Sequence, residues 1–151
     1  MCCVATSFEA SEDFAITKPA GAPCPNLAGH RCAIHSDLAV RGFAGCTVFD
    51  CYGAGPRVTK LVAAGPERDE AFRILLRVHE LMWLLTEAAE LCVRSPSNNG
   101  LRALYQTLAD APIAVLLAAD LTAVEAEARA LLLRVGRELG GRARLVQLRR
   151  C

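Results

Sequence analysis

The sequence predicts a mostly α-helical fold, in which an irregular cysteine-rich N-terminal half packs on a small C-terminal helical bundle. The chain has 151 residues, a length typical of one domain. Its composition changes near Gly65, because six of the eight cysteines precede this glycine and Leu, Ala, Glu and Arg dominate after it. Apolar residues then recur with helical period. We therefore predict a cysteine-rich metal-binding region at 1–64 and a helical region at 65–151, which share one core in a single domain.

The charge balance argues against a general affinity for polyanions. Seventeen Lys and Arg face sixteen Asp and Glu, so the net charge is +1 and gives no field that attracts nucleic acid or anionic lipid. The longest apolar stretch, 71–93, contains six ionisable side chains, which a membrane span does not tolerate. The first residues also lack the basic and apolar segments of a secretory signal. We expect a cytoplasmic protein with no nucleic-acid or membrane partner.

A long amphipathic helix is predicted to begin at Pro66 and to run to about Arg94. Proline suits the first helical position because its missing N–H would be unpaired there in any case. Most apolar side chains of this segment fall on one face. Phe72, Leu76 and Trp83 lie instead along the edge of the charged face. These three need a second covering surface, supplied by the N-terminal half or by a partner such as a second subunit.

Shorter helices are predicted after this one. Residues 95–100 have turn composition and end the long helix, and a short helix follows at 101–110. The apolar segment 113–119 fits a helix or a buried strand by periodicity, and its length and alanines favour a helix. Thr122 and Glu125 form a capping-box pattern that predicts the start of the last long helix. Its predicted end is at Gly140-Gly141, and the tail 142–151 is not assigned.

The cysteines of the N-terminal half suggest a metal centre. A cytosolic chain of this length with eight cysteines favours metal or thiol chemistry over disulfides. Thiolates bind Zn²⁺, Cu(I) and the iron of Fe–S clusters. The spacings are looser than the two-residue knuckles common in zinc fingers, but flanking prolines and glycines free the backbone to surround an ion. The predicted metal ligands are Cys24, Cys32, Cys46 and Cys51, with Cys3 and Cys2 as additional ligands.

Other candidate residues have weaker support. His35 follows Cys32 by three and offers a nitrogen ligand, although a surface histidine is the favoured interpretation. A Cys–His nucleophile would need an orienting Asn or Asp and an oxyanion-hole motif, and no such pattern marks it, so we do not predict an enzyme. Asp50 is expected to accept a hydrogen bond from the loop beside Cys51. Cys92 is interpreted as a packing residue of the long helix.

The N-terminal cysteines and their neighbours follow a definite order. Along the chain stand Cys2-Cys3, Cys24-Pro25-Asn26-Leu27, Arg31-Cys32-Ala33-Ile34-His35, Gly42-Phe43-Ala44-Gly45-Cys46 and Asp50-Cys51. This order resembles the cysteine-cluster domains of bacteria that chelate zinc or iron. Residues 13–21, 51–55 and 79–83 extend the similarity to the N-terminal cysteine-rich region of bacterial pentapeptide-repeat proteins, although the repeat array itself is absent after Gly141. The resemblance implies a zinc or iron centre held by cysteines.

Three functional hypotheses remain open from the sequence. Four thiolates around Zn²⁺ leave no position for a substrate, so a zinc site would be structural. Participation of all six N-terminal cysteines favours an iron–sulfur protein that senses redox state or carries electrons. The third hypothesis is a protein-interaction module without metal, in which Phe72, Leu76 and Trp83 form the contact surface for a second copy or another protein.

Overall fold

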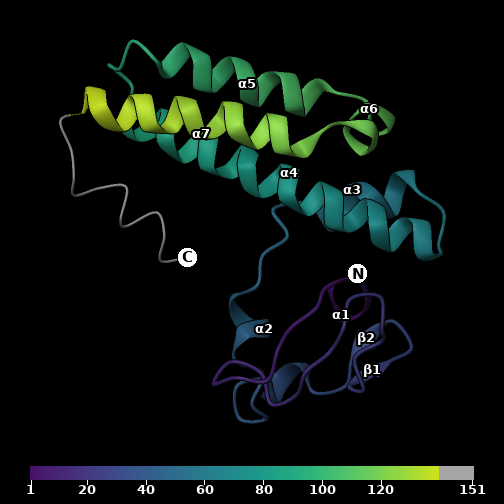
Figure 1. Cartoon of the computed structure of the whole chain (residues 1–151). Coiled ribbons are helices and arrows are strands. Elements are labelled where there is room, and N and C mark those ends of the chain that lie inside the picture. The colour runs from purple at the N-terminus through teal and green to yellow at the C-terminus, as the bar shows by residue number, and fades with distance from the viewer. Residues whose placement is uncertain (140–151) are drawn as a thin grey trace. The chain divides into compact units, whose positions relative to one another are not determined.

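The computed structural model describes residues 1–139 (Figure 1). The chain divides into two compact units within one long helix, α4 (Pro66–Leu91). The first unit is Met1–Leu76, and the second begins at Arg77. The predicted boundary at 64/65 coincides with the loop before α4, and the first turns of that helix belong to the first unit. The prediction of a mostly α-helical protein is confirmed. The predicted helix end at Gly140-Gly141, the tail 142–151 and Cys151 lie outside the described residues.

The first unit combines short elements with one helix that sequence reasoning missed. Its elements are α1 (Cys2–Ala5), β1 (Leu27–Ala28), β2 (Arg31–Cys32), the 3-10 helix η1 (His35–Asp37), α2 (Gly45–Val48), α3 (Ala54–Leu61) and the start of α4 (Pro66–Leu91). The Gly-Ala-Gly-Pro segment at 53–56, which has turn composition, forms the N-cap and first turn of α3. Gly53 adopts φ 87°, which favours glycine, and proline is tolerated in a first helical turn.

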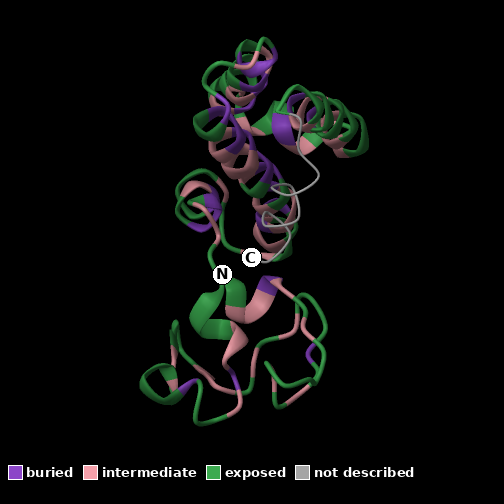
Figure 2. Cartoon of the chain, turned by 90° about the vertical axis from the view of Figure 1, so that its left-hand side faces the viewer, coloured by how far each residue is buried: buried purple, intermediate pink, exposed green. Residues whose placement is uncertain are grey.

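Helix α3 covers the aromatic side chain that seemed to need a partner. Phe72 is 1% exposed. A β-carbon on Gly55 of α3 would lie 3.7 Å from the Phe72 ring, so the small residue allows close approach of the two helices. The chain itself therefore supplies the second surface for Phe72, whereas Leu76 and Trp83 are half-buried. Figure 2 shows the buried residues running along the helices, while the first fifty residues are mostly half-buried or exposed.

The two-residue strands form an antiparallel hairpin in which Leu27 pairs with Cys32 and Ala28 pairs with Arg31. Gly29 supplies the positive φ, 61°, that the tight connection requires. Before the hairpin, the N–H of Leu27 donates to the carbonyl of Cys24 at 2.9 Å. The hairpin therefore returns the chain from Cys24 to Cys32 over a short path.

The second unit contains the rest of α4 together with α5 (Asn98–Asp110), α6 (Ile113–Ala118) and α7 (Leu121–Glu138). Helices α5 and α7 run side by side in opposite directions, as Figure 1 shows, with Gly100 against Leu131. The preference for a helix at 113–119 is confirmed. None of the helices described within 1–139 has the length and apolar character that crossing a membrane requires.

The connection between α4 and α5 is tighter than predicted. Helix α4 starts at Pro66 as predicted but ends at Leu91 instead of Arg94, and α5 starts at Asn98 instead of Leu101. The buried Asn98 side chain donates to the carbonyls of Ala89 at 2.6 Å and Cys92 at 3.1 Å. These bonds satisfy carbonyls at the end of α4 while Asn98 already forms the first turn of α5. The Asn98 side chain therefore links the end of α4 to the first turn of α5.

The predicted cap of the last helix is wrong. Asp120, not Thr122, is the N-cap of α7, and its Oδ1 accepts from the backbone N–H groups of Thr122 at 3.0 Å and Ala123 at 3.4 Å. Aspartate is among the strongest N-cap residues, so it displaces a threonine two positions later. Glu125 consequently does not complete a capping box. Its carboxylate instead accepts from the Arg77 guanidinium of α4, at 2.6 Å and 3.0 Å.

Glu138 at the end of α7 binds the start of α5. Its carboxylate accepts hydrogen bonds from the hydroxyls of Ser95 and Ser97 and from the Ser97 backbone N–H. The Ser95 hydroxyl, followed by the Ser97 hydroxyl, lowers the Glu138 pKa below its ordinary value of 4.5. Ser97 is also the N-cap of α5, so the negative carboxylate of Glu138 interacts favourably with the positive end of the helix dipole.

This arrangement predicts an acid-sensitive contribution to the second unit. A lowered pKa stabilises the fold above the unfolded-state value near 4.5, and the contribution disappears as pH falls through the lower folded-state value. Glu138→Gln should therefore lower the melting temperature at neutral pH, and the gap from wild type should close as the pH drops below 4.5. Thermal melts followed by fluorescence of Trp83, the single tryptophan, measure it. A gap that is equal at neutral and acidic pH would contradict this assignment.

Candidate metal site

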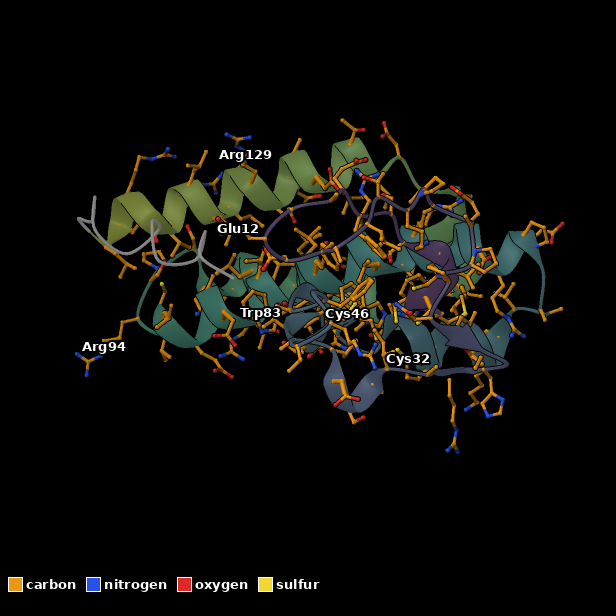
Figure 3. All side chains as sticks on the ribbon, turned by 90° about the horizontal axis from the view of Figure 1, so that it is seen from below. Glu12, Cys32, Cys46, Trp83, Arg94 and Arg129 are labelled. Carbon is orange, nitrogen blue, oxygen red and sulfur yellow. The ribbon has the colours of Figure 1, made fainter. Side chains whose placement is uncertain are left out.

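Five cysteines line a single cavity of about 150 Å³ in the first unit. They come from four separate segments: α1, the turn before β1, the strand β2, and α2. Figure 3 labels one from β2, Cys32, and one from α2, Cys46. Of the six cysteines predicted as ligands, the cavity lining includes Cys2, Cys3, Cys24, Cys32 and Cys46.

Backbone hydrogen bonds fix the segments that carry these thiols. The N–H of Cys24 donates to the carbonyl of Cys3 at 2.7 Å, which joins the first segment to the second. In the hairpin, Cys32 pairs with Leu27. Leu27 closes the turn that begins at Cys24, so this pairing brings the Cys24 and Cys32 segments together. The N–H of Cys46 donates to the carbonyl of Phe43 at 3.0 Å as α2 begins. Local main-chain contacts therefore bring together thiols that span more than forty positions in sequence.

Four phenylalanines form another part of the cavity wall. Phe8, Phe14, Phe43 and Phe49 all line it. The rings of Phe8 and Phe14 stack with centroids 4.5 Å apart, and Phe43 meets Phe8 edge to face at 6.4 Å. A β-carbon at Gly45 would lie 2.4 Å from the Phe14 ring, so α2 must begin with glycine. An apolar shell of this kind limits water access to a bound metal.

The distribution of phenylalanines in the sequence indicates this aromatic wall. Four of the five phenylalanines in the chain lie within the first 49 residues, in the segment that otherwise has turn composition. Aromatic side chains in such a segment need a surface against which they can be buried, and the wall of the cysteine-lined cavity provides it. The pattern of cysteines with Gly and Pro neighbours predicts the thiol ligands but gives these rings no role.

The thiols in the cavity influence one another electrostatically. Burial raises the pKa of Cys3 to about 11, with further contributions from the charge and hydrogen bond of Cys2 and the charges of Cys32 and Cys24. The pKa of Cys46 is raised by partial burial of its thiol and then by Cys2, Cys24 and Cys32, although the residue as a whole is exposed. Negative charge on the neighbouring thiols therefore disfavours ionisation of Cys3 and Cys46. A bound cation would offset this repulsion.

The donor set fits a thiophilic metal in its chemistry. The lining offers five sulfur atoms and neither a carboxylate nor an imidazole. None of the seven cysteines within 1–139 forms a disulfide. In that same part of the chain, no three Cys, His, Asp or Glu side chains form a ready-made metal-binding group. A cysteine sulfur moves between staggered positions by rotation about χ1, so coordination requires side-chain rotation toward a common point.

The remaining candidates lie apart from this cavity. Cys51 is absent from the lining of the cavity, and its sulfur lies 3.4 Å from the position that a β-carbon on Gly55 would occupy, next to α3. The expected hydrogen bond of Asp50 is confirmed, because its Oδ1 accepts from the N–H of Tyr52 at 2.7 Å. His35 is exposed in η1 and does not line the cavity. Cys92 follows the last residue of α4 and is buried, 4% exposed, in agreement with a packing role.

Comparison with known proteins identifies a similar sequence without a described activity. The chain is 35% identical to the uncharacterized protein YybG of Bacillus subtilis (strain 168) over 119 residues, which correspond to 72% of this chain and 43% of that protein. The chain therefore spans less than half of the length of this relative. No protein-family model matches the chain. No solved structure matches it.

Proposed function

We propose that this chain is a cytoplasmic metal-binding protein that holds a zinc ion or an iron–sulfur centre through the thiolates of Cys2, Cys3, Cys24, Cys32 and Cys46. One observation carries the proposal: five of the six N-terminal cysteines, from four segments, line the same cavity. Thiolates are the preferred ligands of Zn²⁺, Cu(I) and iron in clusters. The reducing conditions of the cytosol keep such thiols available for metal.

Zinc is the simpler occupant. Four thiolates complete a tetrahedral Zn²⁺ site with no open position, so zinc would stabilise the first unit and would not activate a substrate. This unit has few regular elements and a partly exposed cysteine segment, which is the situation in which a structural metal contributes most to folding. With five thiols available, one cysteine of the cavity would remain outside the zinc shell.

An iron–sulfur centre is the second candidate, and the size of the cavity favours it. About 150 Å³ is roughly ten times the space that one water molecule needs, so the cavity that these thiols line together with aromatic side chains has room for more than a single ion. A centre with several atoms brings its own sulfide and iron and needs ligands that are further apart. Such a centre would give the protein a role in redox sensing or electron transfer.

The order of the cysteines and the burial of Phe72 both favour the metal-binding proposal over the interaction-module hypothesis. The order of the cysteines resembles bacterial cysteine-cluster domains and the N-terminal region of pentapeptide-repeat proteins, and that resemblance supports the same function. The interaction-module hypothesis has less support, because Phe72 is covered by the chain's own α3 and is not available to a partner.

Metal analysis of protein purified without oxygen tests the proposal. We expect about one zinc ion per chain with no visible absorption, or iron together with acid-labile sulfide and visible charge-transfer bands. Protein that emerges free of metal should take up Zn²⁺, or iron and sulfide, during anaerobic reconstitution. Failure to retain any of these after gel filtration, while the thiols are shown to be reduced, would refute a metal-binding function.

A further inference from the structure

Lys18 is buried, only 3% exposed, beside the cysteine cavity. Its ammonium donates to the carbonyl oxygens of Val4 at 3.1 Å, Thr6, Pro19 at 3.1 Å and Ala22 at 2.8 Å. The same group lies 5.5 Å from the centre of the Phe8 ring, which lines the cavity. A buried charge is costly unless it is fully hydrogen-bonded, and here four carbonyl dipoles and a π face compensate it.

These four carbonyls belong to two segments that the ammonium joins. Val4 and Thr6 are in and directly after α1, which carries the first two thiols, whereas Pro19 and Ala22 precede Cys24. Backbone bonds run along the same two segments, from the N–H of Gly21 to the carbonyl of Val4 at 2.9 Å and between Phe8 and Lys18 in both directions. Two of the four carbonyls, those of Val4 and Pro19, also accept a backbone N–H bond, so the ammonium is their second donor. Its bonds to the carbonyls of Thr6 and Ala22 add contacts to the same two segments.

We propose that Lys18 is a positioning residue that holds the Cys2–Cys3 pair in register with Cys24, so that both segments present their thiols to one cavity. This inference rests on the proposed metal-binding function for its purpose, although the positioning itself concerns the protein without metal. A lysine suits the position because a compact ammonium directs three donors into one small space, while the planar guanidinium of arginine does not.

The test compares Lys18→Met with Lys60→Met. The chain has two lysines, and Lys60 is exposed in the last turn of α3, so its replacement is a matched control for loss of one positive charge. Metal-free, reduced proteins are treated with N-ethylmaleimide, and the rate of alkylation at each cysteine is followed by peptide mass spectrometry. The half-buried Cys3 is the reporter of position. Cys46 in the same unit and the buried Cys92 in the other unit are internal references.

We expect Lys18→Met to raise the alkylation rate at Cys3 roughly tenfold, because charged hydrogen bonds that hold its segment are lost, and to leave Cys46 and Cys92 unchanged. Zinc uptake, measured with Zn²⁺ alone, should fall in this variant and stay at the wild-type level in Lys60→Met. Equal rates in all three proteins would overturn the proposal, and so would an equal increase at all three cysteines. If wild type binds no metal, the metal function fails while the alkylation rates still decide the role of Lys18.

A measurement on wild type protects the test against a variant that does not fold. An amine-acetylating reagent should modify Lys60 rapidly and Lys18 slowly, because the Lys18 amine is enclosed by four carbonyls. Acetylation of Lys18 at the rate of Lys60 in native protein would overturn the proposal. Chains acetylated at Lys18 under mild denaturation and then refolded should show the same faster alkylation at Cys3 as Lys18→Met.

Discussion

Replacing Cys24 or Cys32 with alanine is expected to abolish stable metal binding. Both thiols are half-buried, and both lie on backbone fixed by the β1–β2 hairpin and its preceding turn. Loss of groups that only orient a ligand already lowers metal affinity by about 10–100-fold, so loss of a ligand itself should exceed roughly 100-fold. Competition for Zn²⁺ against a chromophoric chelator measures the difference. An iron–sulfur occupant would instead be lost from the visible spectrum.

Cys51→Ala is the matched control for these variants. Cys51 was predicted as a ligand together with the other three, but it lies next to α3 instead of lining the cavity. We expect its replacement to leave metal stoichiometry and affinity at the wild-type level. If Cys51→Ala loses metal as completely as Cys24→Ala, the ligand set is the one that sequence alone suggested, and the cavity is not the site.

The placement of Cys51 illustrates which part of the site sequence reasoning could reach. Abundance and clustering of thiols predict a centre because the chemistry is independent of geometry. Which thiols converge depends on turns: Asp50 accepts from the Tyr52 N–H, and Tyr52 and Gly53 both adopt positive φ. This turn leads directly into α3 and separates Cys51 from the cavity that Cys46 lines. Spacing along the chain does not encode such a change of direction.

Lys18 is a residue whose role the sequence does not indicate at all. A lone lysine in a polar, turn-rich segment is usually exposed, and its local sequence gives no indication of burial. Its role follows from the carbonyl groups of two separate segments, which converge on its ammonium. Cys2 and Cys3 were predicted only as additional ligands, whereas both line the cavity.

The helical half was more predictable because local signals determine it. Pro66 begins α4 where the fixed φ of proline predicts it, and the alanine-rich segment at 113–119 is a helix. The errors fall at helix ends, where side chains compete for the same backbone groups. Asp120 displaces Thr122 as the cap of α7, and Asn98 extends α5 backwards by three residues. In both places more than one side chain could bind the free N–H or carbonyl groups of the helix end, and the sequence does not show which one does.

Asn98→Ala is expected to destabilise the second unit by about 2–3 kcal/mol, because the carbonyls of Ala89 and Cys92 both lose the Asn98 amide donor. The Cys92 carbonyl then keeps the backbone N–H of Ser95, at 2.9 Å. The side chain is 6% exposed, donates to the carbonyls of Ala89 and Cys92, and accepts from Nε of Arg102 at 2.8 Å. Urea unfolding followed by Trp83 fluorescence reports on this unit, since Trp83 is the only tryptophan and lies on its part of α4.

Asn99→Ala provides the control for Asn98→Ala, because the neighbouring asparagine has the same intrinsic helix propensity and is exposed. It should change the free energy of unfolding by less than about 0.5 kcal/mol, or raise it slightly, since alanine is the better helix former. Asn98→Asp separates hydrogen bonding from size, because it keeps the shape but replaces the donor with a carboxylate facing two carbonyls. If Asn98→Asp is as stable as wild type, the amide does not hold α4 and α5 together, and their tight connection has another cause.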